Sequence, residues 1–123
     1  MTKEAIIEEI HTAIGAHGKW KFRLKIAINT GTTDVSPDQV SCDDQCSFGK
    51  WLYGPTIEPE VAKGMPYIVV KRLHGEFHQI AGDVMVKAIT GRTDEARTLL
   101  DGEFTIKSQN LTKALTKWKR ELQ

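Results

Sequence analysis

The sequence has few cysteines, little net charge and no long apolar run, and each shortage excludes a class of protein. Cys42 and Cys46 are its only cysteines, too few for the disulfide framework of a small secreted domain. Its 17 Lys and Arg residues nearly balance its 16 Asp and Glu residues, for a net charge of +1, which excludes the basic surface typical of nucleic-acid-binding proteins. No apolar run approaches the roughly 20 residues of a transmembrane helix. We therefore expect no nucleic-acid partner and no direct membrane insertion.

The first ten residues also lack the pattern of a secretory signal. Acidic residues interrupt the isoleucines between Met1 and Ile10, whereas a signal has a basic segment followed by an unbroken apolar one. We therefore expect a cytoplasmic protein, in which a thiol near histidines is better suited to metal binding or redox chemistry than to a disulfide. The length of 123 residues, with 40% of them hydrophobic, predicts one domain over residues 1–123.

Apolar residues recur every three or four positions in three long stretches, the spacing of amphipathic helices. The stretches run from residue 2 to about 29, from 67 to 88, and from 93 to 122, with Thr93 as the candidate N-cap of the third. Between the first two, Ser36 followed by Pro37 predicts one short helix that carries the cysteines toward Phe48 and Trp51. No segment alternates as a strand does. The prediction is an all-α fold, an antiparallel four-helix bundle with one short helical connector carrying Cys46.

Histidines and one cysteine form a candidate metal site. His74 and His78 lie four residues apart, one turn apart on the same helix face. His17 falls on the apolar face of the first helix, where a buried imidazole needs a hydrogen bond or a metal. With Cys46 they complete three imidazoles and one thiolate, a full tetrahedral set for zinc. Four protein ligands leave no open position for substrate, so we expect a site that senses or stabilises, and no enzyme.

The histidines have other possible roles besides zinc binding. A His-x-x-x-His pair alone is a weak signal, since core histidines often only satisfy buried polar groups. A zinc protease would have glutamate directly after the first histidine, where this chain has Gly75 and then Glu76. A di-iron bundle needs inward Glu-x-x-His pairs, and none lies near His74 or His78. A haem or iron redox bundle stays open, but it leaves Cys46 unused and predicts a coloured protein.

Three motifs resemble those of the chemoreceptor zinc-binding domain family: His17-x-x-Trp20-Lys21, Cys46-x-Phe48-Gly49-Lys50-Trp51-Leu52 and His74-x-x-x-His78. The resemblance covers nearly the whole chain. It implies a cytoplasmic four-helix bundle, commonly a homodimer, attached to chemotaxis receptors or to diguanylate cyclases. It also implies one Zn²⁺ bound through His17, Cys46, His74 and His78. The chain itself contains neither a Gly-Gly-Asp-Glu-Phe cyclase motif nor the long heptad hairpin of a receptor signalling tip.

The expected function is a zinc-binding sensory or regulatory domain that reports zinc level or thiolate oxidation to chemotaxis or cyclic-di-GMP pathways. The alternative is a structural module for dimerisation or interaction, with zinc that never exchanges. Affinity separates the two, because a very tight structural site would be permanently filled.

Several neighbours of the candidate site also receive predictions. Cys42 is expected to be an ordinary, partly buried residue, with a resolving thiol for Cys46 as the alternative. His11 should face solvent, because its spacing from His17 turns it away from the apolar face. Two tryptophans should pack around the metal and exclude water, and three acidic residues should face solvent. One of these acids, or equally a backbone carbonyl, would orient a ligating histidine. The tryptophans are Trp20 and Trp51, and the acids are Asp43, Asp44 and Glu76.

Overall fold

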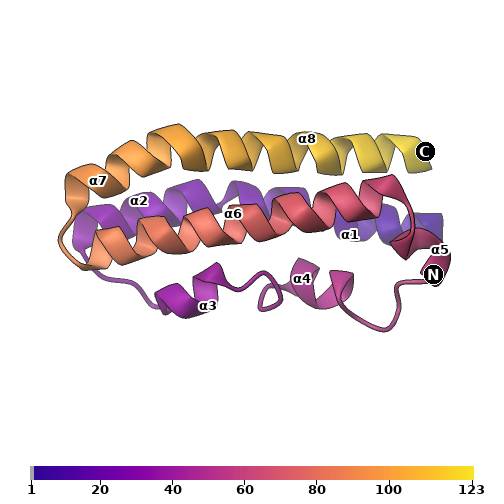
Figure 1. Cartoon of the computed structure of the whole chain (residues 1–123), viewed down its shortest axis with the longest axis horizontal. Coiled ribbons are helices and arrows are strands. Elements are labelled where there is room, and N and C mark those ends of the chain that lie inside the picture. The colour runs from indigo at the N-terminus through magenta and orange to yellow at the C-terminus, as the bar shows by residue number, and fades with distance from the viewer. Residues whose placement is uncertain (1) are drawn as a thin grey trace.

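The computed structural model describes residues 2–123, and every regular element within them is a helix. Figure 1 shows three long helical segments side by side, with short helices along one edge. The first segment is α1 (Lys3–Gly18) with α2 (Trp20–Thr30), the second is α6 (Met65–Ile89), and the third joins α7 (Thr93–Leu99), the π-helix η1 (Leu100–Phe104) and α8 (Thr105–Leu122). The predicted all-α class is confirmed.

The short helices form the connector between the first two long segments. They are α3 (Pro37–Ser41), α4 (Ser47–Leu52) and α5 (Pro59–Ala62). Along this path the chain travels back beside α6 before α6 itself begins, so its direction reverses after α2, after α5 and again after α6 (Figure 1). The connector therefore faces both α1 and α6, which is the position from which it reaches the candidate site.

Helix ends follow the local sequence where short polar residues or glycine occur. The Thr2 hydroxyl accepts a hydrogen bond from the Ala5 N–H at 3.1 Å and caps α1. Ser36 caps α3 in the same way, accepting from the Gln39 N–H at 3.2 Å, with Pro37 at the first helical position as predicted. Gly31 ends α2 with a φ of 72°, a left-handed conformation that glycine adopts without steric cost.

The first helix and the connector differ from the prediction. The helix expected over residues 2–29 is interrupted at Lys19, directly after Gly18, a residue with low helix propensity. The connector contains two short helices next to the cysteines instead of one, and Cys42 and Cys46 lie in the turn between α3 and α4. Two consecutive aspartates occupy this turn, and aspartate favours turns over helix interiors.

The third long segment also differs in two details. Its N-cap is Arg92, whose side chain makes no capping hydrogen bond, so the predicted cap Thr93 is instead the first helical residue. A π-helical turn, which the sequence did not predict, interrupts it at η1, where the Thr105 hydroxyl donates to the Leu100 carbonyl at 2.8 Å. Leu100 and Phe104, the two ends of this turn, remain buried, so the wider turn keeps the apolar face of the helix directed at the core.

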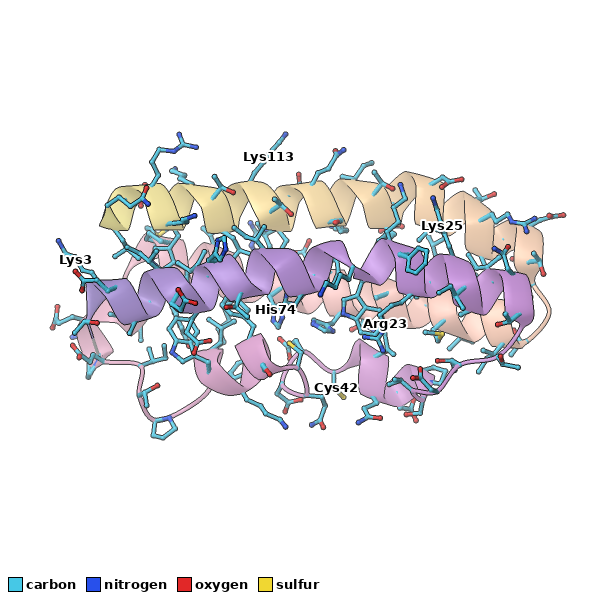
Figure 2. All side chains as sticks on the ribbon, turned by 180° about the vertical axis from the view of Figure 1, so that it is seen from behind. Lys3, Arg23, Lys25, Cys42, His74 and Lys113 are labelled. Atoms are coloured by element: carbon cyan, nitrogen blue, oxygen red, sulfur yellow. The ribbon has the colours of Figure 1, made fainter. Side chains whose placement is uncertain are left out.

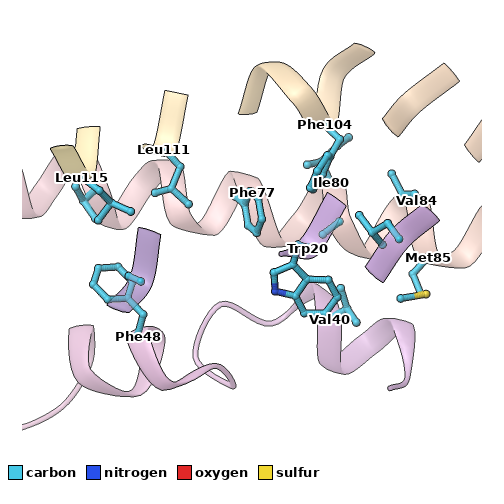
Figure 3. Close-up of a cluster of buried hydrophobic side chains, with 14 of the residues drawn as sticks. Trp20, Val40, Phe48, Phe77, Ile80, Val84, Met85, Phe104, Leu111 and Leu115 are labelled. Carbon is cyan, nitrogen blue, oxygen red and sulfur yellow. The ribbon is translucent and has the colours of Figure 1, made fainter. Parts of the chain in front are cut away.

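The core fills the space between the long segments (Figure 3). Phe77 on α6 and Phe104 on η1 are fully buried, with ring centroids 5.3 Å apart. Trp51 on α4 packs against Trp118 on α8 at 6.0 Å. Aliphatic side chains from every long segment complete the core, including Ile10, Leu24, Val84, Leu111 and Leu115. These contacts fix the helices that carry the candidate ligands relative to one another.

Close approach of α3 to α6 depends on Gly82. A Cβ atom at Gly82 would lie 1.8 Å from the Ser41 Oγ and 3.1 Å from the Ser41 Cα. Glycine in a helix interior costs about 1 kcal/mol relative to alanine, and here that cost is offset by the packing that glycine allows. Val40, the residue before Ser41, is therefore held against α6. Its carbonyl accepts a hydrogen bond from His78, which lies one helical turn before Gly82.

Candidate metal centre

Three separate elements bring the four predicted ligands together. His17 comes from α1, Cys46 from the N-terminus of α4, and both His74 and His78 from α6. One potential ligand atom of each residue lies within 4.8 Å of all the others. Figure 2 shows His74 between the first helical segment and the connector. The structure thus gathers all four side chains at one point, and their binding of zinc stays a prediction.

The separations between these atoms suit a tetrahedral zinc ion. The Nε2 atom of His74 lies 3.0 Å from that of His17 and 3.1 Å from that of His78. The Cys46 Sγ atom lies 3.4 Å from the His74 Nε2 and 3.9 Å from the His17 Nε2. Zn–N bonds of about 2.0–2.1 Å and a Zn–S bond of about 2.3 Å at tetrahedral angles require N···N of about 3.3 Å and N···S of about 3.6 Å. These four separations lie within about 0.3 Å of the required values, and all the ligand atoms lie within 4.8 Å of one another.

Backbone carbonyls orient two of the three histidines. The Nδ1–H of His17 donates to the Ala13 carbonyl at 2.7 Å, and the Nδ1–H of His78 donates to the Val40 carbonyl at 2.9 Å. A carbonyl can only accept, so the proton of each neutral ring resides on Nδ1 and the Nε2 lone pair faces the centre. Of the two predicted ways to orient a ligand, the structure uses the backbone, and Glu76 instead accepts from Lys107 at 2.6 Å.

No backbone carbonyl of the described residues orients His74, and neither position of its ring proton satisfies all the atoms around it. His74 is fully buried, and its Nδ1 atom has no hydrogen-bond partner among residues 2–123. Its Nε2 atom faces the lone pairs of His17 and His78, so a proton on that atom could satisfy only one of the two neighbours. A proton on Nδ1 would leave three lone pairs facing one another, an unfavourable arrangement in a buried site. A cation at the centre removes this conflict.

Burial keeps the three rings neutral, the form that binds metal. Desolvation lowers the pKa of His17 from 6.5 to about 4, the Ala13 carbonyl partly opposes the shift, and His78 adds to it. Desolvation also lowers the pKa of His74 well below its usual range, reinforced by its two histidine neighbours. The pKa of His78 is lowered by burial too, against the Val40 carbonyl and the Asp43 charge. The site therefore presents neutral imidazoles at neutral pH.

Cys46 occupies the N-cap position of α4, where helix N–H groups point at its sulfur. Its Sγ atom accepts from the Gly49 N–H at 3.3 Å. Burial raises the pKa of the Cys46 thiol, while N–H groups that include those of Gly49 and Phe48 lower it. A Cβ atom at Gly49 would lie 1.7 Å from the Asp43 carbonyl oxygen, so only glycine lets the turn before Cys46 fold onto α4. A bound zinc ion would favour the thiolate further.

Aromatic rings surround the site. The Phe48 ring meets His74 edge-on at 5.2 Å, and the Phe77 ring meets His17 at the same distance. Trp20 and Trp51 are buried, and Trp51 packs on Phe48 with centroids 5.6 Å apart. Phe77 lies in the apolar stretch predicted over residues 67–88, and that spacing does not reveal that it contacts ligands on two helices. These rings exclude water from most sides of the site.

Two predictions about neighbouring residues have opposite outcomes. His11 is exposed, as predicted. Cys42 was expected to be partly buried and is instead exposed, because it follows the last residue of α3 on the outer side of the turn. Figure 2 shows its side chain pointing away from the long helices. A cavity of about 260 Å³ on this side has Cys42, Cys46 and His78 in its lining. The role of Cys42 as a resolving thiol stays a prediction.

Comparison with known protein families gives a match to the chemoreceptor zinc-binding domain over residues 17–85. The matched range begins at His17 and extends past His78, so it contains every predicted ligand. Separate comparisons found no match among curated proteins and none among solved structures. None of the helices in the described range is both long enough and apolar enough to cross a membrane.

Proposed function

Because the chain belongs to the chemoreceptor zinc-binding domain family, we propose that it is a sensory or regulatory domain that holds one Zn²⁺ through His17, Cys46, His74 and His78. The observation that carries this proposal is the convergence of their ligand atoms within 4.8 Å. Three imidazole nitrogens and one thiolate are a typical donor set for zinc. Four protein ligands would leave no coordination position for a substrate, so the proposed role is binding and not catalysis.

The signal would arise from the connector. Cys46 is half-buried and lies on the connector, whereas the three histidines lie on α1 and α6 and are buried. Loss of zinc, or oxidation of the thiolate to sulfenic acid, would remove the bond that ties α4 to the long helices. In this proposal α3 and α4 together act as the second helix of an antiparallel four-helix bundle. Their release would change the bundle surface.

The proposed setting is cytoplasmic, and the proposed assembly is a homodimer. The partner would be a chemotaxis receptor, as the family's name suggests, or a diguanylate cyclase, as the resemblance in sequence implies. The whole described chain, residues 2–123, would act as one domain in this setting. Size-exclusion chromatography with light scattering, with and without zinc, measures the assembly directly.

A structural role for zinc is the second candidate, and the burial of three ligands favours it. His17, His74 and His78 are at most 4% exposed, and such a closed site can hold metal permanently. Zinc in purely structural sites contributes about 10 to 16 kcal/mol of apparent binding free energy. A metal held so tightly would not report fluctuations in free zinc.

Affinity and exchange separate the two candidates. Zinc-loaded protein is titrated against chelators of graded affinity, and exchange with isotopically labelled zinc is followed by mass spectrometry. A sensor should have an affinity close to that of cellular zinc buffers and should exchange its zinc measurably. A structural site should bind zinc more tightly and show no measurable exchange. Treatment with hydrogen peroxide tests the redox form of the proposal. Zinc should leave together with modification of Cys46, and release with Cys46 unmodified would contradict that form.

A further inference from the structure

Asp43 and Tyr53 join the two ends of the segment that carries Cys46. The Tyr53 hydroxyl donates to the Asp43 Oδ2 atom at 2.5 Å, across ten positions in the sequence. Asp43 precedes Cys46 in the turn, and Tyr53 directly follows the last residue of α4. The hydrogen bond therefore closes a loop that contains the turn, Cys46 and all of α4.

The same carboxylate rests on α6 beside a proposed ligand. A Cβ atom at Gly75 would lie 3.2 Å from the Asp43 Oδ2, and Gly75 directly follows His74. Glycine is unfavourable in a helix interior, and at this position it leaves room for the Asp43 side chain. Asp43 thus contacts the helix that carries two histidines and the loop that carries the thiol. Its carboxylate is not among the converging ligand atoms.

The hydroxyl of Tyr53 keeps its proton over the whole physiological pH range. Burial, followed by the hydrogen bond to Asp43 and the Asp43 charge, raises the pKa of Tyr53 above its usual value. The Lys71 Nζ atom lies 5.0 Å from the centre of the Tyr53 ring, which places a cation on the other side of the tyrosine. Tyr53 is thereby held from two directions while 45% of its surface stays exposed.

We propose that Asp43 and Tyr53 are positioning residues that keep the Cys46 sulfur in the metal centre, so that breaking their hydrogen bond makes Cys46 the first ligand to leave. This inference rests on the proposed zinc site. Neither residue touches the metal in this proposal. They act by holding the turn between α3 and α4 against Gly75, and an open turn moves the sulfur away from the three nitrogens.

One substitution removes the hydrogen bond and a second weakens it, and a neighbouring aspartate supplies the control. Tyr53→Phe deletes the donor, and Asp43→Asn removes the charge of the acceptor. Asp44→Asn makes the same change one position later, on an exposed side chain whose hydrogen bond in the structure comes from Gln45. The double variant Asp43→Asn/Tyr53→Phe tests whether the two residues act through one interaction.

The measurement is zinc transfer from the loaded protein to a chromogenic chelator, after elemental analysis of the wild type. Each single variant should release zinc about three- to tenfold faster, in keeping with one hydrogen bond to a charged group. The double variant should be no faster than the faster single variant, and Asp44→Asn should stay within about twofold of the wild type. In cobalt-substituted protein, the thiolate-to-cobalt absorption band should weaken in the Asp43 and Tyr53 variants.

Three results would overturn the inference while leaving the zinc site intact. They are release at the wild-type rate in both single variants, additive effects in the double variant, and an unchanged thiolate–cobalt band. An unchanged band together with lower thermal stability of the zinc-free protein would assign the pair a general structural role. Absence of zinc and cobalt binding in the wild type is a different failure, because it refutes the proposed function and the inference with it.

Discussion

Acidification of the zinc-free protein tests whether the fold holds its site histidines neutral. Burial lowers the pKa of His17 from 6.5 to about 4. Between these values the unfolded chain binds a proton at His17 and the folded protein does not. Stability rises with pH wherever the unfolded state binds more protons. The free energy of unfolding should therefore be highest above pH 6.5 and should fall as the pH decreases toward 4.

The size of this loss follows from the shift. A difference of about 2.5 pH units at about 1.4 kcal/mol each gives roughly 3 kcal/mol for His17 alone. The lowered pKa values of His74 and His78 add losses of the same sign. Since domains are typically stable by about 5 to 15 kcal/mol in total, the zinc-free protein should approach unfolding near pH 4.

Urea unfolding of chelator-treated protein, carried out at intervals from pH 7 to pH 5, measures how the free energy of unfolding changes with pH. This interval lies above the usual pKa range of carboxylates. Each histidine held neutral should contribute a slope of about 1.4 kcal/mol per pH unit below pH 6. The variant His17→Gln should reduce the slope by one such contribution. A free energy of unfolding that stays constant between pH 6.5 and pH 5 would refute the reasoning, because it would mean that the folded site accepts protons.

Two further substitutions test the packing around the site. Gly82→Ala should lower the free energy of unfolding by about 1 to 3 kcal/mol, because its Cβ atom would overlap Ser41, whereas Gly15→Ala in α1, with nothing within 4 Å, should raise it by up to about 1 kcal/mol. Equal effects in urea unfolding would contradict the close packing of α3 on α6. Phe77→Ala should cost about 3 to 5 kcal/mol, since the fully buried ring also contacts His17, and a cost below about 1 kcal/mol would contradict its place in the core.

The long helices and the candidate ligands could be predicted because their signals are local. Apolar residues repeat with helical spacing along each long segment, and His74 and His78 share a helix face through that same spacing. His17 could be predicted on the apolar face for the same reason. Cys46 could be predicted as a ligand only from the Phe48-Gly49 sequence that follows it. The structure explains the glycine, because Gly49 leaves room for the Asp43 carbonyl against α4.

Most of the remaining features depend on contacts between distant residues, which no local pattern records. The π-turn at η1 keeps Leu100 and Phe104 in the core without a local signal, whereas the break at Lys19 follows Gly18, whose low helix propensity is a local one. The division of the connector into α3 and α4 follows from packing at Gly82 and from the turn before Cys46. Tertiary packing at Gly82 and at the turn thus adds to the local propensities of Gly18 and of the two aspartates.

Elemental analysis of purified protein, reconstituted with zinc under reducing conditions, tests the central claim most directly. The wild type, Cys46→Ala and His11→Ala are compared, because His11 is exposed and outside the site. The account predicts about one zinc per chain in the wild type and in His11→Ala, with a loss or a marked weakening in Cys46→Ala. A wild type without zinc, or a Cys46→Ala variant that holds zinc as tightly as the wild type, would contradict it.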